Sequence, residues 1–200
     1  MSDESYAPDP TRDHETVSIY PIDDDVKEEL LNTVGEAVLN WSTKDGWPVG
    51  VMHAVVWAKG SFWMTAAAHR HRMAALRRDP RCSVVLTSTG THLGPGKTIT
   101  AKARCIMHED RETKDWFYHA LSFRPGADPE QAAAFEKTLD SPLRVVMELV
   151  PEKWITFDGA KMGMATAGVL PDDKKGPPLS SDAVRLQKEL EARGLANRDS

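Results

Sequence analysis

Residues 98–107 carry the pattern that most constrains the fold, because apolar and polar side chains alternate there from Thr98 to Cys105. Only an extended strand, whose side chains point to opposite faces with a period of two, sorts them into one apolar face and one polar face. The apolar set is Ile99, Ala101, Ala103, Cys105 and Met107, and the polar set is Thr98, Thr100, Lys102 and Arg104. The pattern predicts a strand with one face in a core and the other facing water or a cofactor.

Two hairpin signals place further strands before this one. Asp45-Gly46 follows a short apolar strand and permits the positive φ of a tight turn. The next run, residues 48–57, is apolar on both alternating faces except at His53, which predicts a strand buried on both sides. Lys59-Gly60 then leads into a third strand over residues 61–65, so we expect these three strands to form a meander.

The remaining elements complete a mainly β chain. Further strands are predicted over residues 82–87, 143–150 and 153–157, with Pro151 marking a bend or an edge between the last two. Helical spacing predicts helices after Asp23-Asp24-Asp25, over 72–79 and 111–123, after the cap pattern Asp128-Pro129, and around Ala183, Leu186 and Leu190. The expected fold is α+β and mainly β, a six- to seven-stranded antiparallel barrel with peripheral helices.

A length of 200 residues favours one domain with terminal extensions. We expect an N-terminal arm and short helix over residues 1–33, because the first residues are acidic and contain few apolar side chains. The barrel domain is predicted over residues 34–160. A linker rich in Gly, Ala, Asp, Lys and Pro and a final helix are predicted over residues 161–200.

Composition excludes several classes of function. A net charge of −5 argues against a general nucleic-acid binder, which needs a basic face. Cys82 and Cys105 are too few for a disulfide framework and lack the spacing of a zinc site, so a reduced cytoplasm fits best and no metal is expected. Residues 1–13 are acidic and contain proline rather than being basic and then apolar, and no apolar run has membrane-spanning length, so we expect neither a leader nor a membrane.

The basic run His69-Arg70-His71-Arg72 is the main candidate for binding chemistry. It follows a predicted strand end at Thr65 and the small residues Ala66-Ala67-Ala68, and it opens a predicted helix. The free N–H groups of a helix start favour an anion, and guanidinium groups add bidentate contacts to a phosphate. The alternative is that these cations are ordinary solvated surface charges, which is the usual fate of an arginine run.

The order of these elements resembles the pyridoxamine 5′-phosphate oxidase-like split barrels, which include flavin- and deazaflavin-dependent reductases. The resemblance covers roughly residues 35–160 and is strongest at Arg72 to Val84, where the family has a basic residue, an Asn and a Leu ahead of an Asp-Pro and an apolar strand. Here Arg72 takes the basic position and Ala75 replaces the Asn. The resemblance implies a split β-barrel that binds a flavin.

The same resemblance assigns expected roles to single residues. It implies a cofactor phosphate at Arg70 and Arg72, with His71 as a further donor. Met52, His53 and Ala54 would lie along the isoalloxazine ring, Thr65 and Ala66 beside the phosphate, and Trp154 would approach the cofactor from the other subunit of a homodimer. His53 as a hydrogen-bonded buried histidine and Trp154 as a core residue are the simpler alternatives.

We therefore expect a cytoplasmic, homodimeric, flavin-dependent oxidoreductase that transfers hydride or electrons between FMN and a small organic substrate. A deazaflavin coenzyme is the alternative cofactor. The rival functions are a non-catalytic protein that binds or sequesters flavin, haem or tetrapyrrole, and a dimer that has lost its cofactor. The Gly94-Pro95-Gly96-Lys97 segment leads into a strand and lacks the preceding glycine of a phosphate loop, which excludes a nucleoside triphosphatase. The sequence identifies no catalytic residue.

Overall fold

The computed structural model describes residues 20–174, 176 and 180–195, so most of the predicted N-terminal arm lies outside the described residues. Residues 22–157 form one compact unit, and the described residues outside that range form a second. The strands are β1 (Glu36–Ser42), β2 (Pro48–Ala54), β3 (Val56–Ala58), β4 (Ser61–Ala67), β5 (Arg81–Thr87), β6 (Lys97–His108) and β7 (Arg144–Asp158). The helices are α1 (Asp24–Thr33), α2 (His71–Arg78), α3 (Arg111–Ser122), α4 (Pro129–Leu139), α5 (Gly159–Thr166), the 3-10 turn η1 (Asp172–Lys174) and α6 (Ser180–Ala192).

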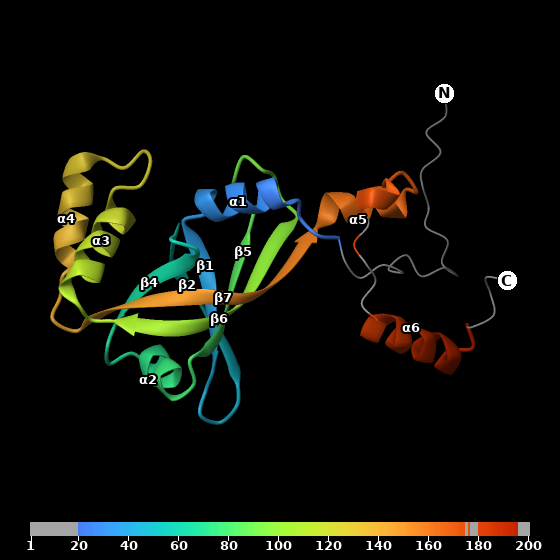
Figure 1. Cartoon of the computed structure of the whole chain (residues 1–200), viewed down its shortest axis with the longest axis horizontal. Coiled ribbons are helices and arrows are strands. Elements are labelled where there is room, and N and C mark those ends of the chain that lie inside the picture. Colours follow the sequence, from blue (N-terminus) through green and yellow to red (C-terminus); the bar gives the residue numbers. More distant parts are fainter. Residues whose placement is uncertain (1–19, 175, 177–179, 196–200) are drawn as a thin grey trace. The chain divides into compact units, whose positions relative to one another are not determined.

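The seven strands form one sheet in the order β2-β1-β5-β6-β7-β4-β3. The five strand pairs with a defined register are all antiparallel. The two edge strands, β2 and β3, are consecutive in the chain and are separated by Val55 alone. A sheet whose opposite edges are joined by one residue has to curl on itself, which gives the predicted mainly β, antiparallel split-barrel fold (Figure 1).

This closure corrects the prediction for residues 48–57, which we expected to be one strand buried on both faces. The segment instead ends as β2 at Ala54 and resumes as β3 on the other edge, so the expected three-strand meander is also wrong. Burial in β2 alternates, and Met52 on its outer face is 56% exposed. Apolar side chains on an open edge strand mimic the pattern of a doubly buried strand, since a partner chain can also cover such a face.

The strand expected to break at Pro151 is continuous. β7 runs unbroken from Arg144 to Asp158. Its pairing with β4 reaches only to Leu149, so the later part of the strand is bonded on one side by β6. A proline, which has no N–H to donate, is tolerated where a strand has a free side.

The alternation in β6 is confirmed. Ile99, Ala101, Ala103 and Cys105 are buried, whereas Lys102 and Arg104 are exposed. The buried residues join the core inside the curled sheet. A second cluster, in which α3 packs on Trp63 and Val146, covers the outer face of β4 and β7. No helix among the residues that the structure describes has the length and apolar character needed to cross a membrane.

The helices that flank the barrel begin and end where the sequence predicts. Pro129 is at the first position of α4, and the Asp128 side chain accepts a hydrogen bond from the Gln131 amide at 2.9 Å. The short α2 ends at Arg78, two residues before Pro80. Figure 1 shows α2 and α1 on opposite sides of the strands, with α3 and α4 paired beside β4. The basic run is therefore held at one end of the barrel.

Candidate functional site

The start of α2 is built by the end of β4 and a tight turn. β4 stops at Ala67, and the Arg70 amide donates to the Ala67 carbonyl at 3.0 Å. Arg70 is the N-cap residue with extended backbone, and His71 is the first helical residue. Met73, Ala75 and Leu76 anchor the helix in the core, so its opposite face is left to the cations. Ala75, at the position of the family's Asn, is buried and offers no polar group.

Three cations at the end of α2 are bound within the protein. Arg77 Nη1 donates to the Ala68 carbonyl at 3.2 Å, and Arg78 Nη2 donates to the Ser42 carbonyl at 2.7 Å. Arg81 forms a two-pronged ion pair with Asp79, with the closest N–O distance at 2.7 Å. These three guanidinium groups stabilise the turn and the neighbouring hairpin.

The two arginines at the start of α2 have no such partners. Among the residues that the structure describes, no carboxylate oxygen lies within 4 Å of the Arg70 or Arg72 guanidinium group, and neither side chain makes a hydrogen bond. Arg72 is half-buried, and its guanidinium carbon lies 5.9 Å from the centroid of the Trp41 ring. Burial and then the charge of Arg70 lower the pKa of Arg72. Two adjacent cations without a counter-ion form a ready anion site.

His53 is close enough to Arg72 for the positive charge of the arginine to act on its imidazole ring. It stands on β2 opposite Ala37, and its Nε2 is buried without a hydrogen-bond partner in the described structure. Burial, and secondly the charge of Arg72, lower the pKa of His53 to about 4, so the imidazole is neutral at pH 7. Within the described protein, the hydrogen bond that the simpler alternative expects is not formed at this atom, and the role of His53 stays a prediction. A neutral ring nitrogen near an open cation is suited to contact a polar ligand.

Met52 and Ala54 lie on the face of β2 opposite to His53, because side chains alternate along a strand. The three predicted residues therefore share a strand but do not share a face. Their main chain remains available to a ligand on one side, since β2 is an edge strand bonded only to β1. The structure thus allows main-chain contacts from residues 52–54 and side-chain contact from His53.

The other predicted residues lie in less open positions. The Thr65 hydroxyl donates to the Val145 carbonyl at 2.8 Å, and Ala66 is buried in the core at 3% exposure. Trp154 packs edge-on against Trp57 and Phe62, with 5.9 Å between ring centroids in each case. Its contact with a cofactor in a partner subunit stays a prediction, and within its own chain the partly buried Trp154 packs against the core.

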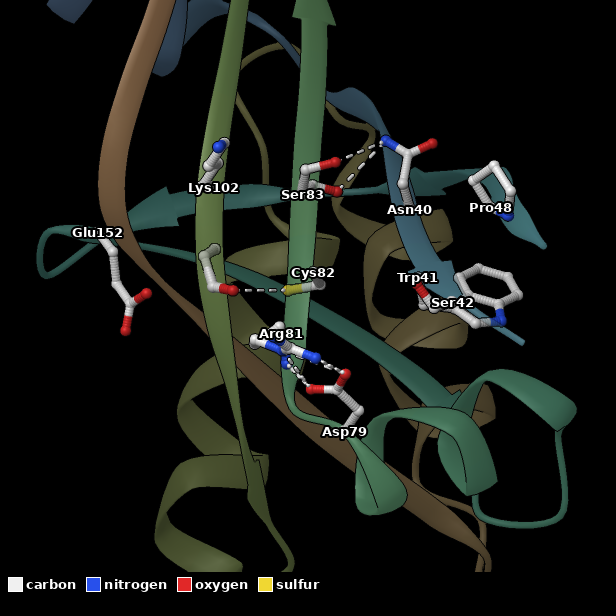
Figure 2. Close-up of a pocket in the computed structure, with 11 residues that line it drawn as sticks. Asn40, Trp41, Ser42, Pro48, Asp79, Arg81, Cys82, Ser83, Lys102 and Glu152 are labelled. Atoms are coloured by element: carbon white, nitrogen blue, oxygen red, sulfur yellow. Dashed lines mark hydrogen bonds and ion pairs between the residues drawn. The ribbon is translucent and has the colours of Figure 1, made fainter. Parts of the chain in front are cut away.

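A pocket of about 490 Å³ opens beside the anion site. Trp41 is common to both, because it lines the pocket and lies under Arg72. Figure 2 shows the wall formed by neighbouring strands: Asn40 donates to the Ser83 hydroxyl at 3.2 Å, and Lys102 stands on the adjacent strand. The remaining lining residues are Ser42, Pro48, Asp79, Arg81, Cys82, Ala103 and Glu152.

Sequence reasoning missed most of this pocket. Lys102 was marked by the β6 alternation, which placed it on the wet or cofactor-facing side. Nothing in the sequence near Asn40 or Ser83 indicated that they line a pocket. The two residues pair across neighbouring strands but are 43 residues apart in the chain, so no local pattern predicts their contact. In the described ranges 20–174, 176 and 180–195, no three His, Cys, Asp or Glu side chains gather in the manner of a metal site.

Solved structures with the same fold differ in what their names say they do. A conserved hypothetical protein of Mycobacterium tuberculosis has a TM-score of 0.60 at 18% identity, covering 80% of this chain and 94% of its own. An F420 reductase has a TM-score of 0.51 at 16% identity, covering 64% and 94%. HutZ, the haem storage protein of Vibrio cholerae, has a TM-score of 0.52 at 16% identity, covering 67% and 94%. At these identities the likeness shows the fold alone.

The sequence itself decides the family. No curated protein matches the chain significantly in sequence. The family model described as pyridoxamine 5′-phosphate oxidase matches residues 25–158, which include the whole curled sheet and the start of α2. That range spans more than half of the chain. The expectation drawn from the order of strands and the basic helix is confirmed: the chain belongs to the pyridoxamine 5′-phosphate oxidase family.

Proposed function

We propose that the chain is a flavin-dependent oxidoreductase that holds the phosphate of FMN at Arg70 and Arg72. The observation that carries the proposal is the state of Arg72, a half-buried guanidinium group with no counter-ion among the residues that the structure describes. A phosphate supplies the missing charge and accepts the bidentate bonds that a guanidinium group offers. His71, the exposed first residue of α2, is placed to add a further donor.

The isoalloxazine ring would lie along β2. The free edge of residues 52–54 supplies main-chain donors and acceptors, and the unpaired His53 Nε2 supplies a polar side-chain contact. Thr65, whose hydroxyl is bound to the Val145 carbonyl, and the buried Ala66 would border the phosphate only through the main chain near the end of β4. A deazaflavin coenzyme is the alternative, supported by the structural likeness to an F420 reductase. Lys102 lines the pocket that shares Trp41 with the anion site, and its charge would suit the longer charged tail of such a coenzyme.

The flavin supplies the redox chemistry, a hydride or electron transfer with a small organic substrate. The protein's own residues bind and orient it. Arg70 and Arg72 hold the phosphate, the β2 main chain positions the ring, and the apolar side chains of the barrel exclude water. No side chain is assigned as acid or base, because His53 is neutral and without a proton-transfer partner at pH 7.

We further propose that the protein works as a homodimer in the cytoplasm. The outer face of β2 exposes Met52, which a second subunit would cover. In such a dimer the partner would complete the cofactor pocket, with Trp154 as the predicted contribution from the other chain. Sedimentation of the purified protein tests the dimer directly, and a monomer that binds FMN stoichiometrically would contradict it.

Haem or tetrapyrrole storage is the second candidate function. One observation favours it: the Nε2 of His53 is neutral and unpaired, which is the state in which an imidazole ligates haem iron. The fold is shared with a haem storage protein. In this function the protein would bind the cofactor and perform no turnover.

The absorbance spectrum of the purified protein separates the two functions. Flavin bands that bleach with a reduced nicotinamide support the oxidoreductase, whereas a Soret band supports haem storage. Titration with FMN should then show saturable binding that Arg72→Glu abolishes while the circular dichroism spectrum stays unchanged. Unchanged FMN affinity in Arg72→Glu would remove Arg72 from the site. A protein that takes up neither FMN nor a deazaflavin would overturn the proposal.

A further inference from the structure

Another arginine without an ion pair in the described structure lies where the curled sheet closes. Arg124 follows α3 and reaches the junction between the two edge strands. Its Nη1 donates to the Gly35 carbonyl at 2.8 Å, and its Nη2 donates to the Val55 carbonyl at 3.0 Å. The Val55 amide also donates to the Gly35 carbonyl at 3.0 Å. Arg124 therefore ties the start of β1 to the link between β2 and β3.

The backbone at this junction is fitted to the guanidinium group. A Cβ at position 35 would lie 2.4 Å from Arg124 Nη1, so glycine is required for the close approach of the side chain. Both acceptors are neutral carbonyls. In the described parts of the chain no carboxylate oxygen lies within 4 Å of Arg124, and burial lowers the pKa of Arg124, with the charge of Glu36 acting in the opposite direction. The Arg124 guanidinium group is therefore partly shielded from water and forms no ion pair within the described structure.

Two cavities lie against this cation. One of about 510 Å³ and one of about 320 Å³ share Thr33, Val34, Gly35 and Arg124 in their walls. The larger cavity has the apolar side chains of Leu31, Val55, Val56, Trp57, Ala120, Phe123 and Pro125 in its wall, together with Asn32, although slightly more of its exposed wall is polar than apolar. The wall of the smaller one is evenly polar and apolar and includes Thr87, Thr89, Thr91, Glu36 and Met52. The hydrogen bonds to the Gly35 and Val55 carbonyls account for a structural role of Arg124. They do not account for the two cavities beside its guanidinium group.

The walls select the chemistry of a ligand. A guanidinium group has five N–H donors, of which the two carbonyls take two, so further donors remain for an anion. The apolar side chains in the wall of the larger cavity, among them Val56 and Phe123, favour a ligand with a ring or a short alkyl body. Glu36, which lies on the other side of the same cation, repels a second negative charge. A monoanion with an apolar body satisfies all three conditions.

We propose that the larger cavity binds a small monocarboxylate with an apolar body, with its carboxylate on Arg124 and its body between Phe123 and Val56. The proposal does not depend on the flavin, since none of the three residues belongs to the anion site at α2. A ligand there would also brace the junction at Val55, where the two edges of the sheet meet.

Benzoate is the probe, and benzamide is its uncharged control of the same shape. Calorimetric titration of the purified full-length protein, with and without FMN, should show benzoate binding at least about tenfold more tightly than benzamide, because only the anion pairs with the guanidinium group. Arg124→Gln should weaken benzoate binding to the level of benzamide. Arg81→Gln, which removes an exposed, already paired arginine, should leave it unchanged.

Two further variants test the proposal even if Arg124→Gln fails to fold. Phe123 is 39% exposed and lines the cavity, so Phe123→Ala should weaken benzoate about fivefold while the protein stays folded. Gly35→Ala should displace the flexible end of Arg124 and weaken benzoate without removing the charge. Equal binding of benzoate and benzamide, or wild-type affinity in both variants, would overturn the proposal. Arg72→Glu should retain benzoate binding, so the loss of FMN binding in that variant is a separate result.

Discussion

The two ends of α2 carry the same residue type in two different states. Arg78, the last residue of α2, is bound by the Ser42 carbonyl, and Arg81, which follows the helix as the first residue of β5, is bound by the Asp79 carboxylate. Arg70 and Arg72, at its start, have no anionic partner in the described structure, although Arg72 is the more buried. A paired arginine contributes to structure, and a half-buried unpaired one is costly unless a ligand completes it. We therefore propose that the paired arginines anchor the structure and that Arg70 and Arg72 bind the ligand.

The largest effect should come from replacing a charged arginine with neutral glutamine at the start of α2 and, as a control, at its end. Arg72→Gln should weaken FMN binding about 30- to 100-fold, because charge-assisted bonds to a phosphate are lost. Arg78→Gln, a matched change six residues along the same helix, should alter FMN affinity less than about twofold. Fluorescence quenching of FMN measures both. If the two variants weaken FMN equally, the phosphate contacts both ends of α2 or neither, and the contrast fails.

The second effect concerns acid stability. The pKa of His53 is about 4 in the folded protein and the ordinary value is 6.5, so only the unfolded chain takes up a proton between these values. The contribution of His53 is fully present above pH 6.5 and is lost as the pH falls towards 4. Because the ring is partly open to solvent, the loss should be about 1–2 kcal/mol.

His53→Gln should remove that part of the pH dependence. Urea unfolding at pH 7 and at pH 4.5 measures the difference in both proteins. Bound FMN should weaken the dependence in the native protein if the cofactor contacts Nε2. An identical slope in His53→Gln would show that other groups cause the acid sensitivity of the fold.

Local patterns predicted the elements and failed where distant strands meet. The β6 alternation and the Asp128 cap depend on neighbours in sequence, and both were correct. The edge position of β2 depends on which strands pair, and Val55 carries no sign that it joins opposite edges of the sheet. An apolar run on an open edge therefore looked like a buried strand.

The binding site shows the same limit. The family pattern identified Arg72, but nothing near it in sequence distinguishes it from Arg78, whose partner Ser42 lies 36 residues away. Arg124 gave no signal at all, because its acceptors Gly35 and Val55 are 89 and 69 residues distant. Charge content is readable from sequence, whereas the presence or absence of a partner requires the fold.

A smaller effect should appear in the free energy of unfolding. Here Arg78→Gln should have the larger effect and Arg72→Gln the smaller one, the reverse of their effects on FMN binding. Arg78→Gln removes an exposed bond to the Ser42 carbonyl and should lower the free energy of unfolding by about 0.5 kcal/mol. Arg72→Gln should leave it unchanged or raise it slightly, since it ends the repulsion with Arg70. Urea unfolding without FMN measures both. A large loss in Arg72→Gln would assign Arg72 to the structure, and the weaker FMN binding would then follow from local unfolding.

The smallest effect should come from the exposed pair beyond the helix. Hydrogen bonds from Arg81 hold the pKa of Asp79 at about 2, so the pair is intact at any pH at which the protein is studied. Solvent screens both groups, and we expect Arg81→Gln to leave the unfolding midpoint and the FMN affinity where they are at physiological salt. Titration of the Asp79 carboxyl by NMR should move its pKa back towards 3.8 in that variant. An Arg81→Gln protein with weaker FMN binding would place Arg81, which lines the adjoining pocket, among the cofactor contacts and shift the boundary between anchor and binding residues past the end of α2.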